Sequence, residues 1–278
     1  MSQPFRLNKE GLINRNKKIS FTFNGKKLFG YEGDTIASAL IANGIHLVGR
    51  SFKYHRPRGF FGAGVEEPNA KLQVEFNGHS EPNVNATEME LVEGLSATSQ
   101  NCWPSVNFDI GAINNFLKMF FPAGFYYKTF MWPKSFWYKI YEPFIRKAAG
   151  LGVASLEKDK ERYEHKFEYC DLLVTGSGPS GLASAYAAAK NGAKVILAED
   201  KPRFGGTLLT DDVSIDNLSG KDWAEKIISE LKSMPNVTVK NRSQVFGYYD
   251  HNMLVMFCLL YTSPSPRDAT LSRMPSSA

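Results

Sequence analysis

The sequence has little cysteine and no clustered histidine. Its three cysteines, Cys102, Cys170 and Cys258, lie far apart, so they form neither a disulfide framework nor a Cys-x-x-Cys metal pair. The five histidines are scattered without the spacing of zinc ligands. We therefore expect a reducing, cytoplasmic compartment and no metal site. The sequence identifies no catalytic acid, base or nucleophile, and His55 is the histidine that we would test first.

The sequence also lacks a long hydrophobic run. Its most apolar stretch, residues 116–145, is interrupted by four lysines and three prolines. The longest uncharged run within this stretch, MFFPAGFYY, is far shorter than the roughly 20 residues that a membrane span needs. The first residues, MSQPFRLNKEG, contain no apolar segment of the kind found in a secretory signal. We expect a protein that does not associate with a membrane.

Acidic residues are scarce at the N-terminal end. Residues 1–58 contain eleven lysines and arginines but only three acidic residues. The positive charge of this segment therefore exceeds the net charge of +5 of the whole chain. Such a basic face suits nucleic acid, a cofactor phosphate or an acidic partner subunit, and it is equally typical of a solvated surface. Charge alone leaves these alternatives open.

Residues 18–97 have the pattern of a small α+β domain. The segment ISFTF alternates apolar and polar residues before Asn24-Gly25, a strong hairpin signal. A short helix follows, with Asp34 as its expected N-cap and Gly44 at its C′ position. The segments IHLV and KLQVEF are predicted to be strands, and EPNVNATEMELVEG supplies one or two more.

This order of elements is similar to that of the β-grasp domain of plant-type ferredoxins. Those proteins hold an iron–sulfur cluster by thiolates spaced C-x₄-C-x₂-C, with a distant fourth cysteine. The corresponding loop here, residues 50–70, contains no cysteine. We therefore expect a β-grasp, ferredoxin-like domain without an iron–sulfur cluster.

Two further segments differ in composition from the predicted domains. Residues 98–168 are rich in aromatic residues and form a connecting segment, whose rings we expect to pack between domains. Residues 257–278 are predicted to be a disordered tail, because eight of the seventeen residues 262–278 are serine or proline. The abrupt change in composition suggests that this tail is an artefact of a truncated gene model.

The segment DLLVTGSGPSGLASAYAAAKNGAKVILAED has the strand, turn, helix and strand of a dinucleotide-binding unit. Gly176 permits a tight turn, Gly178 lets the backbone approach a pyrophosphate, and Gly181 allows close packing of the helix. The helix N-terminus offers free N–H groups to the phosphates. Residues 169–256 are therefore predicted to form an α/β, Rossmann-type FAD/NAD-binding domain that lacks its later strands.

An acidic residue follows the second strand of this unit. The Glu199 carboxylate is expected to accept hydrogen bonds from a ribose hydroxyl, which disfavours NADP, and Asp200 is the alternative. The Arg-x-Gly-Gly doublet that follows resembles the second fingerprint of flavoproteins with two dinucleotide-binding domains, which implies that Gly205-Gly206 would pass close to the dinucleotide. The predicted cofactor contacts are Gly176, Ser177, Gly178, Pro179, Ser180, Gly181, Glu199, Asp200, Arg203, Gly205 and Gly206.

Several segments together resemble the α subunit of heterotetrameric sarcosine oxidase. They are FTFNGKKLFGYEGDTIASALIANGIHLVGRSFKYHRPRG, PAGFYYKTFMWP, IRKAAGLG and the glycine-rich segment above, and the resemblance extends over about residues 18–254. It implies a dinucleotide domain that holds NAD, with FAD as the alternative in the same site. It also implies partner β, γ and δ subunits, with FAD in the β subunit and FMN near the α/β interface.

The resemblance further implies an oxidoreductase that converts sarcosine to glycine with O₂ and passes a one-carbon unit to tetrahydrofolate. The family's α subunit is several times longer than this chain, so we expect the chain alone to be poorly folded and inactive. The basic segment RSFKYHRPRG, with Arg56 and Arg58, is a hypothetical subunit or flavin interface.

Two other functions fit parts of the sequence. One is a related FAD/NAD-dependent amine or amino-acid dehydrogenase subunit, which would pass electrons to a carrier instead of O₂. The other is a nucleic-acid-binding module that uses the basic loop 50–60, where bases could stack on aromatic rings. The glycine-rich segment disfavours this second alternative, so we expect no nucleic-acid partner.

Overall fold

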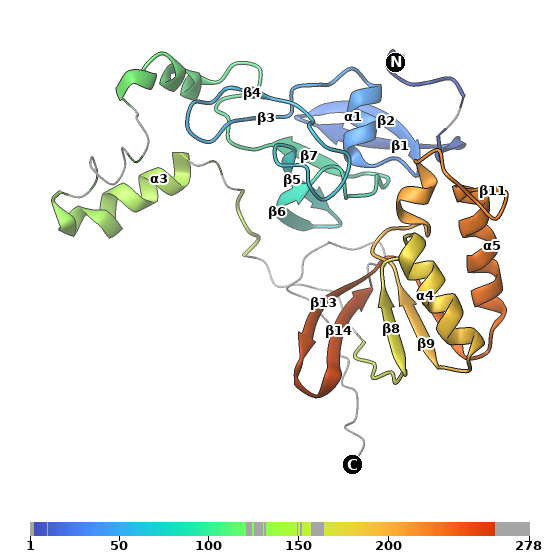
Figure 1. The fold of residues 1–278 in the computed structure, drawn as a ribbon. Helices are drawn as coiled ribbons and strands as arrows, with labels where there is room; N and C mark the ends of the chain where they lie inside the picture. The colour runs from blue at the N-terminus through green and yellow to red at the C-terminus, as the bar shows by residue number, and fades with distance from the viewer. Residues whose placement is uncertain are drawn as a thin grey trace. The chain divides into compact units, whose positions relative to one another are not determined.

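The computed structural model describes residues 3–9, 11–120, 124, 130, 132–148, 150, 152–156 and 164–258. Contacts divide the chain into two compact units, residues 1–159 and 160–278 (Figure 1). The four predicted segments, 18–97, 98–168, 169–256 and 257–278, remain predictions. Most of the predicted tail, and most of the segment PAGFYYKTFMWP, lies outside the described residues.

The first unit contains a five-stranded mixed sheet in the order β2-β1-β7-β5-β6. Strand β1 pairs antiparallel with β2 and parallel with β7, and β5 pairs antiparallel with both β7 and β6. The elements are β1 (Asn14–Phe23), β2 (Lys26–Glu32), α1 (Ile36–Ala42), β3 (Gly49–Arg50), β4 (Pro57–Arg58), β5 (Lys71–Phe76), β6 (His79–Asn85) and β7 (Ser96–Ser99).

The core of this unit lies between the sheet and α1. Apolar side chains of β1, among them Phe21 and Phe23, are buried together with Ile36 and Leu40 of the helix and Leu72 of β5. Alternation in the strand and three-to-four-residue spacing in the helix therefore bring apolar faces together, as the sequence pattern predicts.

The turn and the helix end that the sequence predicts are confirmed. Asn24 and Gly25, between β1 and β2, both have positive φ angles, 47° and 77°. Such a turn matches the twist of antiparallel strands, and it favours Asn-Gly. Gly44 has a φ of 77° just beyond the C-cap Asn43, where glycine avoids the strain of a left-handed backbone.

The predicted N-cap is wrong by one residue. Thr35 caps α1, because its side chain accepts from the N–H of Ser38 at 3.2 Å and the Ser38 hydroxyl accepts from the N–H of Thr35 at 3.0 Å. Asp34 is instead a buried anchor. Its carboxylate accepts from the Arg6 guanidinium at 2.7 and 3.1 Å and from the N–H of Tyr31 at 2.8 Å.

The predicted strand IHLV is also wrong, because residues 45–48 form no strand. The N–H of Val48 donates to the carbonyl of Arg58 at 3.0 Å, and the next residues, β3, pair antiparallel with β4. The chain therefore folds back on its own basic loop at this point and does not extend the main sheet.

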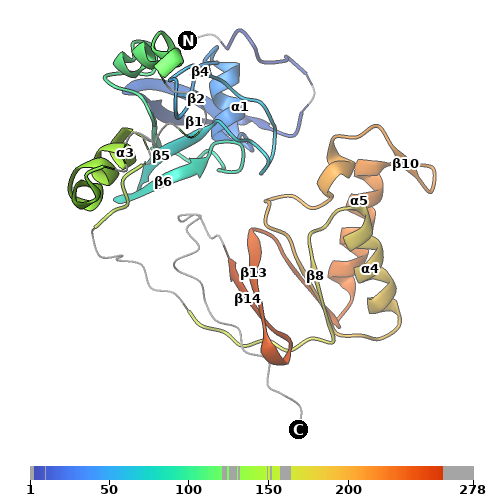
Figure 2. The same ribbon diagram turned by 60° about the vertical axis from the view of Figure 1, so that its left-hand side comes forward.

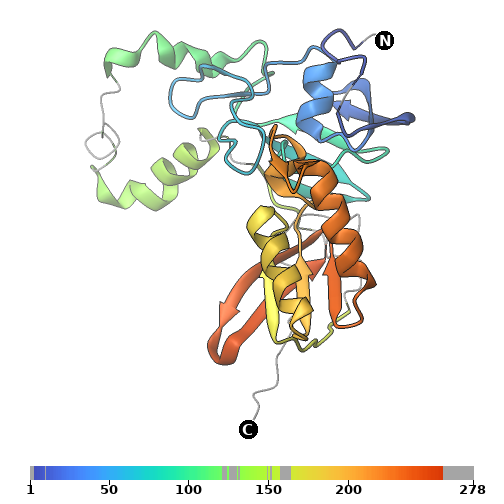
Figure 3. The same cartoon turned by 45° about the vertical axis from the view of Figure 1, so that its right-hand side comes forward.

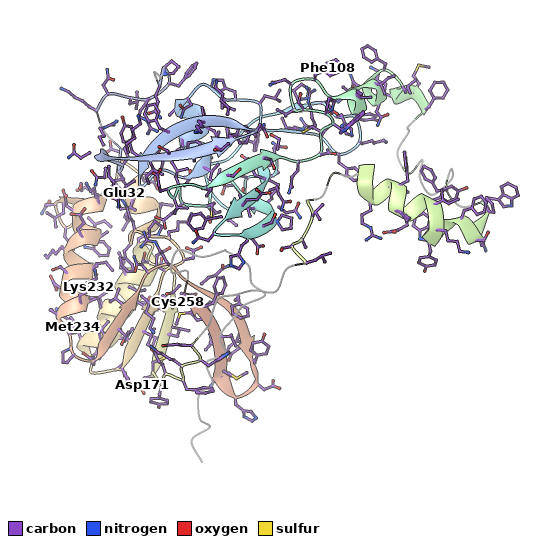
Figure 4. The ribbon with its side chains drawn as sticks, turned by 180° about the vertical axis from the view of Figure 1, so that it is seen from behind. Glu32, Phe108, Asp171, Lys232, Met234 and Cys258 are labelled. Atoms are coloured by element: carbon purple, nitrogen blue, oxygen red, sulfur yellow. The ribbon has the colours of Figure 1, made fainter. Side chains whose placement is uncertain are left out.

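The rest of the first unit has short helical turns with many exposed aromatic rings, including Phe108 (Figure 4). Interdomain packing of these rings remains a prediction. The helical segments are 3-10 turns at Ile110–Asn115, Lys118–Phe120 and Lys134–Phe136, a π-helical turn at Trp137–Tyr141, and α3 (Glu142–Ala148).

The second unit is built on a parallel three-stranded sheet in the order β12-β9-β8. Helices α4 and α5 lie side by side on one face of this sheet (Figures 2 and 3). The elements are β8 (Leu172–Thr175), α4 (Pro179–Lys190), β9 (Val195–Ala198), a 3-10 turn (Gly206–Leu209), β10 (Ser214–Ile215), β11 (Leu218–Ser219), α5 (Gly220–Ser233), β12 (Val237–Lys240), β13 (Ser243–Tyr249), a 3-10 turn (Asp250–Asn252) and β14 (Met253–Cys258).

Helix α5 buries the apolar stripe that its sequence predicts. Trp223, Ile227, Ile228 and Leu231 are all buried in the core that α4, β8 and β9 complete. Ser219 caps the helix by accepting from the N–H of Asp222 at 3.2 Å. None of the helices in the described ranges is long and apolar enough to cross a membrane.

Candidate dinucleotide-binding site

The glycine-rich segment lies at the carboxyl end of β8, where the chain turns into α4. The N–H of Gly176 donates to the carbonyl of Ala198 at 2.7 Å, which brings the turn beside the end of β9. Asp171, by contrast, precedes β8 and lies at the opposite edge of the sheet (Figure 4). The carboxyl edge of an open parallel sheet is where such folds bind ligands.

Each of the three motif positions needs glycine for a different physical reason. Gly176 has a φ of 87°, a left-handed conformation that strains other residues. A Cβ atom on Gly181 would lie 2.0 Å from the carbonyl oxygen of Gly176, so the first turn of α4 leaves no room for a side chain. A Cβ atom on Gly178 would meet nothing within 4 Å. The backbone at Gly178 therefore faces open space that a ligand can occupy.

The N-terminus of α4 is not capped by a side chain within the described part of the chain. Gly178 is the N-cap residue, and Pro179 occupies the first helical turn. Pro179 and Ser180 are both exposed. The first N–H groups and the positive end of the helix dipole therefore remain available to an anion such as a pyrophosphate.

Ser177 is completely buried and joins three parts of the site. Its N–H donates to Glu199 Oε2 at 2.7 Å, and its hydroxyl donates to the same oxygen. The hydroxyl also accepts from the N–H of Gly205 at 3.0 Å. One small side chain thus connects the first turn, the end of β9 and the second glycine doublet. Sequence reasoning missed this link, because serine in a glycine-rich turn resembles a solvent-exposed residue.

The Glu199 carboxylate is buried at the end of β9. Burial is the largest influence on this group and raises its pKa, and a hydrogen bond with the Asp200 side chain raises it further. Hydrogen bonds from Ser177 and from the N–H of Lys201, at 3.1 Å, act in the opposite direction. The carboxylate is consequently held in one orientation at the end of β9.

The second glycine doublet packs against the first turn. A Cβ atom on Gly206 would lie 3.0 Å from the Cα atom of Gly178. Gly205 and Gly206 both have positive φ angles, 124° and 53°. The structure thus brings this doublet, the first turn and Glu199 together, whereas Asp200 and Arg203 are exposed beside them.

The basic loop of the first unit is tied to the segment that follows the sheet. His55 Nδ1 lies 2.6 Å from Asp109 Oδ2, and both side chains are largely buried. Arg50 donates to the carbonyl of Val106 at 2.6 and 2.8 Å, and Arg56 Nε donates to the Asn115 side chain at 2.9 Å. Three residues of the predicted interface therefore contribute to the unit's own structure.

The ligand chemistry of a metal centre is missing from the described residues. No group of three or more His, Cys, Asp or Glu side chains there could hold a metal ion. The loop that carries the cluster thiolates in plant-type ferredoxins contains none here, so its residues do not fit an iron–sulfur cluster.

Together these features define the class: a protein with a ferredoxin-like first unit and an oxidoreductase-type nucleotide unit. Residues 16–102 match the family described as "2Fe-2S iron-sulfur cluster binding domain". Residues 171–245 match "FAD dependent oxidoreductase".

More particularly, the chain is a homologue of the sarcosine oxidase α subunit, which confirms the resemblance seen in the sequence. It is 56% identical over 249 residues to sarcosine oxidase subunit alpha of Rhizobium meliloti (strain 1021), which covers 90% of this chain and 25% of that protein. It is 32% identical over 263 residues to the same subunit of Corynebacterium sp. (strain U-96), covering 92% of this chain and 22% of that one. The chain thus spans about a quarter of the length of these relatives.

A solved structure supports the fold. The crystal structure of L-proline dehydrogenase from P. horikoshii matches with a TM-score of 0.56 and 18% sequence identity, over 92% of this chain and 39% of that one. At this identity the likeness concerns the fold alone.

Proposed function

We propose that the turn 176–181, Glu199 and the doublet Gly205-Gly206 bind the ADP part of a dinucleotide. NAD is the first candidate, and FAD is the alternative in the same site. The observation that carries the proposal is the open, uncapped N-terminus of α4 beside a buried carboxylate. Such a helix end attracts phosphate, and such a carboxylate attracts a ribose hydroxyl.

The carboxylate restricts which dinucleotide can bind. A 2′-phosphate on the ribose would bring two negative charges together at Glu199, so NADP is disfavoured. NAD and FAD both have an unmodified adenosine ribose, and the glycine pattern serves either. The family match of residues 171–245 supports FAD. NAD is what the resemblance of the sequence to the α subunit implies.

The decisive experiment is the substitution Gly178→Ala. A methyl group there meets no protein atom within 4 Å, so the thermal stability of the unliganded protein should not change. The same methyl group would occupy the space proposed for the pyrophosphate, and the dissociation constants of NAD and FAD, measured by calorimetry, should rise at least about tenfold, which corresponds to about 1.4 kcal/mol of lost binding free energy. Ser184→Ala, an exposed change on the same helix, is the control. Unchanged affinity in Gly178→Ala would contradict the proposal.

We further propose that the first unit is a β-grasp domain and that the second is the first part of a Rossmann-type domain. The parallel order β12-β9-β8, with both helices on one face, supports the second assignment. In this proposal the chain is the dinucleotide-binding part of the α subunit of a sarcosine oxidase complex. The complex would oxidise sarcosine to glycine with O₂ and tetrahydrofolate, with FAD and FMN bound in the assembly.

The proposed partners are the β, γ and δ subunits of such a complex. Arg58, in β4, is exposed and belongs to the basic loop proposed as a subunit or flavin interface. Arg58→Ala should reduce assembly or flavin content of the complex, measured by size-exclusion chromatography and flavin absorbance. The exposed change Lys71→Ala, in β5 of the same unit, is the control. Normal assembly and flavin content in Arg58→Ala would contradict a role of the basic loop as a subunit or flavin interface.

A further inference from the structure

The loop between β4 and β5 keeps a definite conformation although it lacks the thiolates of an iron–sulfur domain. Glu67 lies at its centre and is 1% exposed, which is unusual for a carboxylate. A buried charge is tolerated only where charges or hydrogen bonds compensate for the loss of water. The contacts of Glu67 therefore show what holds this loop.

Four main-chain N–H groups donate to the Glu67 carboxylate. Oε2 accepts from Phe61 and from Gly62, both at 2.6 Å. Oε1 accepts from Asn69 at 2.7 Å and from Ala70 at 3.3 Å. The two oxygens thus bring together the beginning and the end of the loop.

These hydrogen bonds dominate the ionisation of the side chain. Burial by itself raises the pKa of Glu67, but the four backbone donors outweigh it and the pKa is lowered. Glu67 is therefore an anion within a ring of N–H groups. Only a negatively charged group, or a strong acceptor, satisfies four converging donors.

The positions joined by this carboxylate have a recognisable spacing. Gly62, Glu67 and Ala70 are separated by four and by two residues, the same intervals as the first three thiolates of a plant-type cluster. In such clusters the anionic sulfurs accept hydrogen bonds from the protein. Here Glu67 occupies the middle position, and its carboxylate contacts the N–H groups of the other two.

From this geometry we infer that the Glu67 carboxylate takes the structural place of an iron–sulfur cluster. It is a built-in anion that gathers the N–H groups of Phe61, Gly62, Asn69 and Ala70. The loop keeps its conformation without a cluster because one negative group has replaced another at the centre of the same ring of donors. Glu67 is thus a positioning residue for the loop and for the strand that Ala70 precedes.

Hydrogen exchange of the full-length protein tests this inference. In Glu67→Gln an NH₂ group replaces one carboxylate oxygen and cannot accept, so at least one pair of amides, 61 and 62 or 69 and 70, loses its acceptor and should exchange about tenfold faster, as the loss of about 1.4 kcal/mol of protection would give. Glu75→Gln, a change of an exposed glutamate in β5, is the control. Amides of the β1–β2 hairpin serve as the internal reference. Equal exchange of the four amides in both variants would overturn the inference.

Two further measurements extend the test, and the second uses the wild-type protein, so it stays decisive if Glu67→Gln does not fold. In Glu67→Ala, added acetate should slow exchange of the four amides, whereas chloride at equal ionic strength should not. Treatment of the wild-type protein with iron and sulfide under anaerobic conditions should produce no cluster absorption. Absence of the acetate effect, or formation of a stable cluster, would count against the replacement of a cluster by Glu67.

Discussion

The main-chain N–H of Ser177 lies 2.7 Å from Glu199 Oε2, and the Ser177 hydroxyl donates to the same oxygen. These two residues are 22 positions apart in the sequence and both are buried. The parallel pairing of β8 with β9 places the two strand ends side by side. The proposed phosphate-binding turn and the proposed ribose-binding residue therefore form one hydrogen-bonded unit.

Removal of the Ser177 hydroxyl should weaken this unit. In Ser177→Ala the buried N–H of Gly205 loses its acceptor, and Glu199 loses a donor. An unsatisfied buried polar group costs about 1–3 kcal/mol, so the free energy of unfolding should fall by about that amount. Chemical denaturation measures the change, and Ser184→Ala on the exposed face of α4 should have little effect. Equal stability of the two variants would show that Ser177 is not the link.

A methyl group at Gly181 should disrupt the turn. It would lie 2.0 Å from the carbonyl oxygen of Gly176, and main chain at such a distance must move. We expect Gly181→Ala to destabilise the protein by about 1–3 kcal/mol, the usual range for overpacking, and to weaken dinucleotide binding as well. Gly178→Ala adds the same methyl group where there is space and should leave the unfolding temperature unchanged. If both variants unfold alike, the steric argument fails.

The raised pKa of Glu199 gives stability a definite dependence on pH. The folded protein holds the carboxyl proton more tightly than the unfolded chain, whose carboxyl group has the ordinary value of 4.5. The stability that Glu199 contributes is therefore complete below this value and is lost as pH rises through the folded pKa. Unfolding experiments on wild-type protein and Glu199→Gln should show the wild type losing stability relative to the variant as pH increases. A constant difference between them would contradict the raised pKa.

Dinucleotide binding should depend on pH in the opposite direction. In the proposed site a ribose hydroxyl would donate to the ionised carboxylate, so the affinity for NAD should rise as Glu199 loses its proton. Below the pKa the loss should approach about tenfold per pH unit. Calorimetric titrations at several pH values measure the effect, and Glu199→Gln should show weak binding without this dependence. If the affinity of the wild-type protein depends on pH as little as that of the variant, Glu199 does not bind the ribose.

Asp109 should be essential for the order of the segment that follows β7. Its carboxylate accepts from His55 and from the N–H groups of Trp103 and Gly111, at 3.0 and 3.1 Å for the latter two. Asp109→Asn removes one acceptor from a buried site and should cost about 1–3 kcal/mol. Hydrogen exchange should show faster exchange at residues 103 and 111 in Asp109→Asn, but not in the exposed change Asn107→Ala. No difference between the two variants would mean that this carboxylate does not hold the segment.

Local sequence signals determined several elements directly. Asn24-Gly25 forms the hairpin because both residues tolerate positive φ, and Gly44 ends α1 for the same reason. The stripe of Trp223, Ile227 and Leu231 packs into the core because three-to-four-residue spacing places it on one face of α5. The order of strand, glycine-rich turn and helix is likewise as the sequence indicates, because the residues that specify it are neighbours in the sequence.

Tertiary structure decided what depends on residues that are distant in the sequence. Asp34 has the side chain of a good N-cap, but Arg6 and Tyr31 bind its carboxylate and Thr35 caps the helix instead. The burial of Ser177, and its hydrogen bonds with Glu199 and Gly205, arise only when segments 22 and 28 positions apart in the sequence meet. A sequence reveals which groups can form hydrogen bonds. Folding determines which of these groups are buried away from water and must therefore be hydrogen-bonded to each other.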